Sequence, residues 1–188
     1  MEKPVPSHQW PAGTIFTVGH STLPIERFIQ ILKTYGIACL LDIRTVPKSR
    51  HNPQFSGDAL RKSLAVADIG YRALPSLGGL RHARKDSQNT GWRNKSFRGY
   101  ADHMQTDEFQ EGLHDLIETG HKARVAIMCA EAVPWRCHRS LVADALNARD
   151  IPVVEIISET AHRMHKLTPF AHVEGNQVSY PPEQGSLL

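Results

Sequence analysis

Apolar and polar residues follow one another along the start of the chain in a pattern that predicts a strand, a helix and a second strand. Residues 14–18 are β-branched and aromatic, which is typical of a strand. The next apolar residues recur at the spacing of one helix face, so we expect a helix that Thr22 caps, with Pro24 in its first turn and Gly36 at its end. Residues 37–43 are almost all apolar, which indicates a strand buried on both faces of a parallel sheet.

The alternation of strands and helices continues over the rest of the chain. Ser56 and Thr106 are expected to cap two later helices, and Gly120 to end the second of them. Residues 81–95 are polar without a periodic pattern, which predicts a long loop. The whole pattern predicts one doubly wound, mostly parallel α/β sheet with helices on both faces. The other predicted elements are helices at 56–67, 107–118 and 137–149, strands at 71–74, 124–128 and 153–157, and a hairpin at 173–178.

Length and composition agree with one compact soluble domain. The chain has 188 residues, of which 40% are hydrophobic and 22% are charged, and no apolar run is long enough to cross a bilayer. We expect the domain at 14–180, between an N-terminal extension at 1–13 and a C-terminal tail at 181–188. Three cysteines and the lack of an apolar leader favour a reducing cytoplasm over a disulfide framework.

The net charge of +3 hides an uneven distribution of charged residues. From Ile43 to Tyr100 there are twelve Lys or Arg residues and three Asp residues, a balance of +9, and the rest of the chain has ten basic and sixteen acidic residues, a balance of −6. A basic segment of this kind is typical either of an anion-binding face or of a solvated surface. We therefore expect an anionic small molecule or a nucleic acid as the partner, and no membrane.

Side chains that can carry chemistry follow three of the predicted strands. His20 and Ser21 follow the first strand, Asp42 and Arg44 stand at the end of the second, and Cys129 and Glu131 follow the strand at 124–128. Ligands of open α/β sheets bind beyond the carboxyl ends of the strands, so these residues are expected to share one cleft. The expected catalytic residues are Cys129, His20, Asp42 and Glu131.

The segment from Cys129 to Arg139 brings two cysteines to the start of a predicted helix. Nearby cations and a helix N-terminus lower the pKa of a thiol, so Cys129 and Cys137 are both candidate nucleophiles. The leading expectation is that Cys129 is the nucleophile or redox thiol and has a depressed pKa. A Cys-x5-Arg phosphatase loop is absent, because Arg136 lies seven places after Cys129. The same helix start suits an anion, and the expected substrate-binding residues are Ser21, Arg44, Arg98, Tyr100, Cys137, His138 and Arg139.

Two other interpretations of these residues remain open. Cys129, Cys137 and His138 offer ligands that suit zinc or iron, although the usual Cys-x2-Cys spacing is absent. The basic segment 44–98, with aromatic residues such as Trp92 among its cations, suits a non-catalytic module that binds a nucleotide or a nucleic acid.

Six sequence blocks, in the same order along the chain, also carry a family resemblance. They are Thr17-Val18-Gly19-His20-Ser21-Thr22, Leu41-Asp42-Ile43-Arg44 with Pro47 and Ser49, Asn52-Pro53-Gln54-Phe55, Leu77-Gly78-Gly79, Arg98-Gly99-Tyr100-Ala101, and Met128-Cys129-Ala130-Glu131 through Cys137-His138-Arg139. Over residues 14–157 the chain resembles the family called domain of unknown function 488, or DUF488. The resemblance implies a Rossmann-like α/β domain with these blocks around a common cleft, and it supplies no established reaction. The leading hypothesis is a cysteine-dependent hydrolase or transferase that binds an anionic, nucleotide-like or phosphate-bearing substrate.

Overall fold

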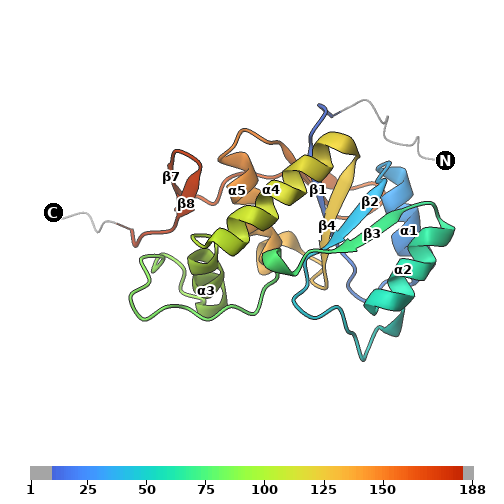
Figure 1. Cartoon of the computed structure of the whole chain (residues 1–188), viewed down its shortest axis with the longest axis horizontal. Coiled ribbons are helices and arrows are strands. Elements are labelled where there is room, and N and C mark those ends of the chain that lie inside the picture. The colour runs from blue at the N-terminus through green and yellow to red at the C-terminus, as the bar shows by residue number, and fades with distance from the viewer. Residues whose placement is uncertain (1–9, 184–188) are drawn as a thin grey trace.

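The computed structural model describes residues 10–183, and its centre is a six-stranded sheet (Figure 1). The strand order is β3-β2-β4-β1-β5-β6, and within these residues only β6 runs antiparallel to its neighbour in this sheet. The expected mostly parallel α/β sheet is therefore confirmed. Its strands are β1 (Ile15–Gly19), β2 (Cys39–Asp42), β3 (Gly70–Ala73), β4 (Val125–Cys129), β5 (Val153–Ile156) and β6 (His162–Met164), and β7 (His172–Glu174) and β8 (Gln177–Ser179) form a separate hairpin.

Helices cover both faces of the sheet. Side chains alternate between the two faces along each strand, so both faces are apolar and both are buried by helices. Phe16 of β1 packs with Phe28 in one hydrophobic core, and Ile15 packs with Leu113 in a second core on the opposite face. The first core contains α1 (Ile25–Thr34) and α2 (Gly57–Val66), and the second contains α3 (Lys95–His103), α4 (Asp107–Lys122) and α5 (Arg139–Asn147). Three short 3₁₀ helices complete the set: η1 (Pro53–Phe55), η2 (Pro75–Leu77) and η3 (Pro134–Arg136).

The predicted helix boundaries are partly correct. Thr106 caps α4, where its hydroxyl accepts the Phe109 N–H at 3.3 Å. Thr22 does not cap α1, because Pro24 occupies the capping position there. Gly120 does not end α4, which continues to Lys122. A side chain at Gly120 would overlap Ile15 of β1, so this glycine allows the helix to approach the sheet closely.

Two elements were not predicted from the sequence. Helix α3 begins at Lys95, and the Asn94 side chain caps it by accepting the N–H groups of Ser96 and Phe97. Strand β6 pairs with β5 at the edge of the sheet and is only three residues long. The predicted tail at 181–188 lies mostly outside the described residues, as do residues 1–9 of the predicted N-terminal extension.

The strand order places three carboxyl ends side by side at the centre of the sheet. Gly19 of β1 is in register with Cys129 of β4, and Asp42 of β2 is in register with Met128. The chain leaves β1 in one direction to build β2 and β3, and later returns to insert β4 between β2 and β1. Such a reversal of strand order is where open α/β sheets bind their ligands.

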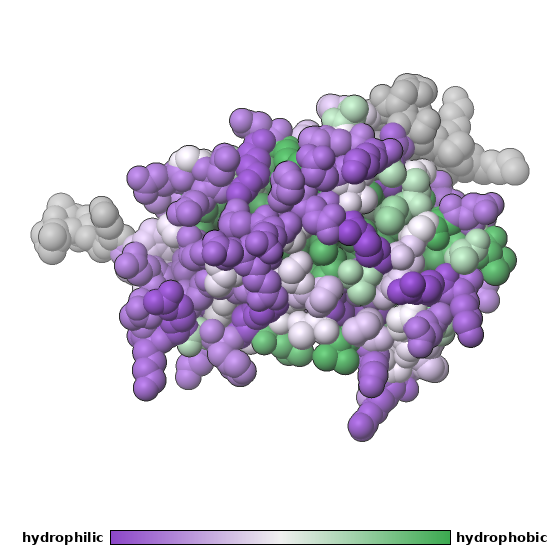
Figure 2. Space-filling view, in the orientation of Figure 1, coloured by the Kyte–Doolittle hydropathy of each residue, from purple (hydrophilic) through white to green (hydrophobic). Residues whose placement is uncertain are grey.

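The outer surface is mostly polar where α4 crosses it. Figure 2 shows hydrophilic residues over most of that face, with apolar residues confined to small patches. Among the described residues, no helix is both long enough and apolar enough to span a membrane.

Candidate functional site

A cavity of about 520 Å³ opens beyond the carboxyl ends of β1, β2 and β4. Its walls come from the segments that follow these strands, from the loop after η2 and from the start of α3. The predicted site residues that line it are His20, Arg44, Tyr100, Cys129, Glu131, Cys137 and His138.

The cavity also has lining residues that were not predicted as site residues. Lys48 and Arg136 add positive charge, whereas Leu80 and Phe97 add apolar surface. Leu80 is 82% exposed and holds a φ angle of 56°, a conformation that is unfavourable for a residue with a side chain. The polar loop that precedes α3 has no periodic pattern, so which of its residues face the cavity cannot be predicted from the sequence.

Cys137 lies two residues before the first residue of α5, and His138 between them is the N-cap of that helix. The Arg139 N–H donates to Cys137 Sγ at 3.5 Å, and His138 Nδ1 lies 3.6 Å from the same sulfur. Burial alone raises the pKa of this thiol. Hydrogen bonds from Cys129 and His138, with the charges of His138 and Arg139, outweigh burial and lower the pKa of Cys137 to about 3. Cys137 is therefore the thiolate of the site.

His138 is held so that one ring nitrogen faces Cys137. Its Nε2 lies 3.0 Å from the Ile43 carbonyl oxygen, and because a carbonyl only accepts, Nε2 carries a proton and donates it there. Nδ1 is then the nitrogen next to the Cys137 sulfur. Gly79 packs beside this ring, and a Cβ at Gly79 would lie 3.0 Å from Nδ1. The Leu77-Gly78-Gly79 block thus leaves room for the imidazole.

Cys129 has the opposite electrostatic character. It is 3% exposed at the end of β4, and burial raises its pKa well above the ordinary value. Its hydrogen bond with Cys137 adds to that rise, because a thiol that donates to a thiolate keeps its proton. The expectation of a depressed pKa for Cys129 is therefore wrong. Cys137, at the start of α5, carries the negative charge, and Cys129 keeps its proton.

Arg139 lies beneath the two sulfurs and is fully buried. Its Nη2 donates to the Glu131 carbonyl oxygen at 2.6 Å, but within residues 10–183 its Nε and Nη1 have no oxygen or nitrogen acceptor. Burial lowers the pKa of Arg139, yet its interactions with the two cysteines outweigh burial and raise that pKa overall. Gly19 makes this packing feasible, since a Cβ there would overlap the Glu131 carbonyl and lie 2.9 Å from Nη2.

Asp42 holds Arg44 in place rather than facing the cavity. The carboxylate is fully buried and accepts from Arg44 Nε at 2.9 Å, from Arg44 Nη2 at 2.6 Å and from the Tyr71 hydroxyl at 2.7 Å. Arg44 Nη2 also donates to the Phe55 carbonyl at 2.7 Å. The guanidinium is therefore fixed at one wall of the cavity, where it is 8% exposed.

His20 is a neutral side chain next to Arg44. Its Nδ1 lies 2.8 Å from the Ser21 carbonyl oxygen and so carries a proton, and its Nε2 lies 3.4 Å from Arg44 Nη1. The ring stacks on Phe55 with 4.2 Å between centroids. Burial is the main cause that lowers the pKa of His20, and Arg44 adds to the effect.

Ser21 and Arg98 are two predicted site residues that do not line the cavity. Ser21 has a φ angle of 47°, and its N–H donates to the Ala130 carbonyl at 2.9 Å, which ties the β1 and β4 loops together. Arg98 donates through Nε and Nη2 to the Trp92 carbonyl oxygen. The guanidinium of Arg98 is thus used to hold the loop before α3.

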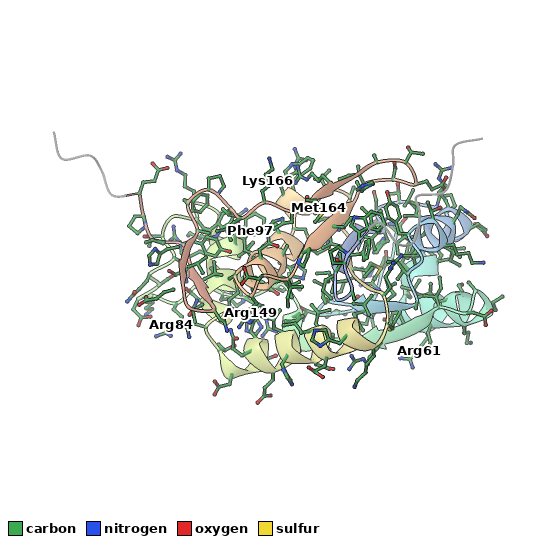
Figure 3. The ribbon with its side chains drawn as sticks, turned by 90° about the horizontal axis from the view of Figure 1, so that it is seen from above. Arg61, Arg84, Phe97, Arg149, Met164 and Lys166 are labelled. Carbon is green, nitrogen blue, oxygen red and sulfur yellow. The ribbon has the colours of Figure 1, made fainter. Side chains whose placement is uncertain are left out.

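The positive charge of the segment 44–98 is dispersed. Arg72, Arg81 and Arg84 pair with Asp115, Glu108 and Asp86, respectively. Arg61 and Arg84 lie toward opposite ends of the molecule (Figure 3). Of the Lys and Arg residues in segment 44–98, Arg44 and Lys48 line the cavity. The segment is therefore not one continuous basic face.

The metal-binding interpretation finds no support in the geometry. Among residues 10–183, no group of three or more His, Cys, Asp or Glu side chains is arranged to hold a metal ion. His138 instead uses Nε2 to hold the Ile43 carbonyl, and Cys129 uses its sulfur to contact Cys137.

Comparison with known proteins identifies a family without a known activity. A family model described as "Domain of unknown function DUF488" matches residues 24–146, which is more than half of the chain. The matched range includes Asp42, Arg44, Cys129, Cys137 and His138, and it begins after His20. No curated protein and no solved structure matches the chain.

Proposed function

The chain belongs to the DUF488 family, and from that premise we propose that it is an enzyme in which the Cys137 thiolate attacks an anionic, phosphate-bearing substrate bound in the cavity. The observation that carries the proposal is the place of Cys137: its sulfur lines the cavity at the N-terminus of α5, where its pKa is lowered to about 3. A thiolate, and not a thiol, is the nucleophilic form of cysteine. This assigns to Cys137 the role that the sequence suggested for Cys129.

His138 is the proton carrier of the proposed reaction. In the first step the Cys137 sulfur forms a bond to the electrophilic atom, and the bond to the leaving group breaks with its electron pair. The proposed reaction starts with a proton on both ring nitrogens of His138. The leaving group takes the proton from Nδ1, which lies 3.6 Å from the sulfur, and Nε2 keeps its own. In the second step water or another acceptor attacks, its proton passes to Nδ1, and the thiolate is released. Water makes the enzyme a hydrolase, and another acceptor makes it a transferase.

Positive charge around the cavity supports an anionic substrate. Arg44, Lys48 and Arg136 line the walls. Arg44 is held by Asp42 and Tyr71, so its guanidinium is already oriented when a ligand arrives. Asp42 is thus a positioning residue in this proposal, and Glu131 and His20 remain candidate acid or base groups because both line the cavity.

The test is the pH dependence of alkylation by iodoacetamide, followed residue by residue by peptide mass spectrometry. We expect Cys137 to be alkylated at a rate that hardly changes between pH 5 and pH 8, because it is a thiolate throughout. An ordinary thiol gains about tenfold in rate per pH unit over the same range. The shape of the profile is the criterion, since the lower intrinsic nucleophilicity of a low-pKa thiolate offsets part of its gain in absolute rate.

Cys39→Ser and Cys137→Ser are the matched variants for this test. Cys39 lies at the opposite end of β2, and burial raises its pKa, so Cys39→Ser should leave the pH-independent reaction intact. Cys137→Ser should abolish it. Inorganic phosphate, added as the simplest anionic probe, should slow alkylation of Cys137 in the wild-type protein and less so in Arg44→Ala. A rate at Cys137 that rises steadily up to pH 8.5 would contradict the proposal.

A further inference from the structure

Cys137 is not an isolated cysteine, because a second cysteine, Cys129, lines the same cavity. Cys129 and Cys137 are 3% and 4% exposed, and each shifts the pKa of the other. Cys129 ends β4 and Cys137 follows η3, so seven residues of one turn join them. The third cysteine, Cys39, is in register with Val125 at the other end of β4, about 13 Å along the strand from Cys129.

We propose that Cys137 and Cys129 form a peroxide-reactive pair, in which a hydroperoxide oxidises Cys137 and Cys129 converts the product into an intramolecular disulfide. The pairing rests on geometry: the Cys137 sulfur accepts the N–H of Arg139 at a helix start, and a second cysteine, Cys129, lines the same cavity. The inference rests on the proposed function only in taking Cys137 as the reactive thiolate.

The chemistry balances with hydroperoxide as the single oxidant. The Cys137 thiolate attacks the terminal peroxide oxygen, the O–O bond breaks, and the products are a Cys137 sulfenic acid, which keeps the hydrogen of the peroxide, and an alkoxide or hydroxide. That leaving oxygen takes up a proton from water. The sulfur of Cys129 then attacks the Cys137 sulfenic acid, and the S–S bond forms as one water molecule leaves with the Cys129 proton. The two cysteines together have lost two electrons, and these have reduced one hydroperoxide to an alcohol or water.

The surroundings of the pair suit both steps. Arg139 places Nε and Nη1, which within the described residues meet no oxygen or nitrogen acceptor, beside the sulfurs where negative charge shifts to the leaving oxygen. The cavity gives a small peroxide access to sulfurs that are otherwise buried. Because Cys129 lines the same cavity as Cys137, its thiol can react with the sulfenic acid before a second peroxide arrives. The disulfide therefore protects Cys137 from irreversible oxidation and switches off its nucleophilicity until a dithiol reduces it.

The experiment treats the full chain with a stoichiometric amount of hydrogen peroxide and analyses it by intact mass and by non-reducing peptide mapping. We expect a loss of two hydrogens in mass, a Cys129–Cys137 cross-link, and a fall from three titratable thiols to one. Alkylation of Cys137 by iodoacetamide should disappear and return after dithiothreitol. The Cys39→Ser variant should give the same cross-link.

Two single variants separate this inference from the proposed function. In Cys129→Ser we expect the Cys137 sulfenic acid to persist and to be trapped by dimedone, then to gain further oxygen with excess peroxide. In Cys137→Ser we expect no cross-link and no dimedone adduct. If wild-type Cys137 shows pH-independent alkylation but peroxide yields oxygen adducts or links between chains in place of the Cys129–Cys137 bond, the pair is not a resolving pair, and the proposed function stands. A failure of both measurements would remove the two together.

Discussion

Two clusters of buried polar residues lie along α5, and they differ in how completely their hydrogen-bonding groups are paired. The sulfur–arginine cluster, Cys129, Cys137 and Arg139, lies at the start of the helix beside the cavity. The carboxylate–histidine cluster, Asp144, Glu155, His165 and Tyr180, connects the middle of the helix to β5 and to the C-terminal segment.

Every charged group in the carboxylate–histidine cluster has a partner. His165 lies between the two carboxylates, with Nδ1 2.7 Å from Glu155 and Nε2 2.8 Å from Asp144. Tyr180 donates to the second Asp144 oxygen at 2.7 Å, and Arg163 donates to the second Glu155 oxygen. Burial lowers the pKa of His165, but the two carboxylates outweigh it and raise that pKa to about 9. His165 is therefore a cation that is held on both sides.

This difference in hydrogen bonding indicates a structural role for the carboxylate–histidine cluster and a functional role for the sulfur–arginine cluster. A saturated network has no hydrogen-bonding capacity left for a ligand, so the carboxylate–histidine cluster anchors the C-terminal segment to the sheet. The sulfur–arginine cluster keeps donors on Arg139 without oxygen or nitrogen acceptors in the described residues, and it faces a cavity. Unsatisfied groups of this kind are tolerated where a ligand or a reaction uses them. The following variants test that contrast.

The largest effect is expected from removing a carboxylate of the saturated cluster. Asp144→Ala leaves the His165 cation, the Tyr180 hydroxyl and the Thr168 N–H without their common acceptor. We expect the free energy of unfolding to fall by about 3–5 kcal/mol, as for other broken buried pairs. Urea denaturation measures this fall. Asp86→Ala, which breaks an exposed pair with Arg84, is the control and should leave the urea midpoint in place. Equal effects of the two variants would show that the cluster is no anchor.

A smaller effect is expected from pH on the same cluster. The pKa of His165 is about 9 in the folded protein and 6.5 as the ordinary value, so the folded state holds a proton that the unfolded state releases first. The stabilisation from His165 is complete below about pH 6.5 and is lost as pH rises through about 9, with at most about 3 kcal/mol at stake. Urea unfolding between pH 6 and pH 9.5 measures it. His165→Gln should flatten this dependence, and an unchanged slope in that variant would assign the effect to other groups.

Arg139→Met should act more on reactivity than on stability. The variant removes the desolvation cost of the buried cation together with its attraction to the Cys137 thiolate, and because these two effects oppose each other, we expect the free energy of unfolding to fall by less than in Asp144→Ala. Loss of the cation should raise the pKa of Cys137, since that charge is one of the causes that lower it. The midpoint of the alkylation profile measures the shift. A large loss of stability with an unmoved midpoint would reverse the contrast.

The smallest effect is expected from Gly79→Ala. The new Cβ would lie 3.0 Å from His138 Nδ1 and push the imidazole away from Cys137. We expect a rise of at most about one unit in the pKa of Cys137 and a stability cost below about 1 kcal/mol. Leu80→Ala, which trims the next side chain at the mouth of the cavity, is the control and should leave the alkylation profile unchanged.

The fold and the location of the site could be predicted from the sequence because both depend on local signals. Apolar periodicity predicted the strands from β1 to β5, and the carboxyl-end rule brought His20, Arg44 and Cys129 to one cavity. Helix α3 was missed because its apolar face is short and lies next to a long polar loop, although Asn94 gave a capping signal.

The division of labour between the cysteines could not be predicted, because it depends on contacts between distant residues. The Ile43 carbonyl fixes the His138 ring across 95 positions of sequence, and that contact directs Nδ1 to Cys137. Likewise, no sequence pattern shows that Asp42 is saturated by Arg44 and Tyr71, or that Arg98 is engaged by the Trp92 carbonyl. Hydrogen bonds made in the folded chain decide these roles.

The position of β4 between β1 and β2 also determines the stage of folding at which Cys137 becomes a thiolate. β4 pairs with strands that lie far earlier in the chain, and such long-range pairings form late in folding because a large loop must close first. Until they form, Cys137 has neither the buried Arg139 nor an oriented His138, and it is a thiol like any other. The reactivity of the Cys137 thiolate therefore indicates that the chain has finished folding. In a nascent or unfolded chain, Cys137 is present as an ordinary thiol.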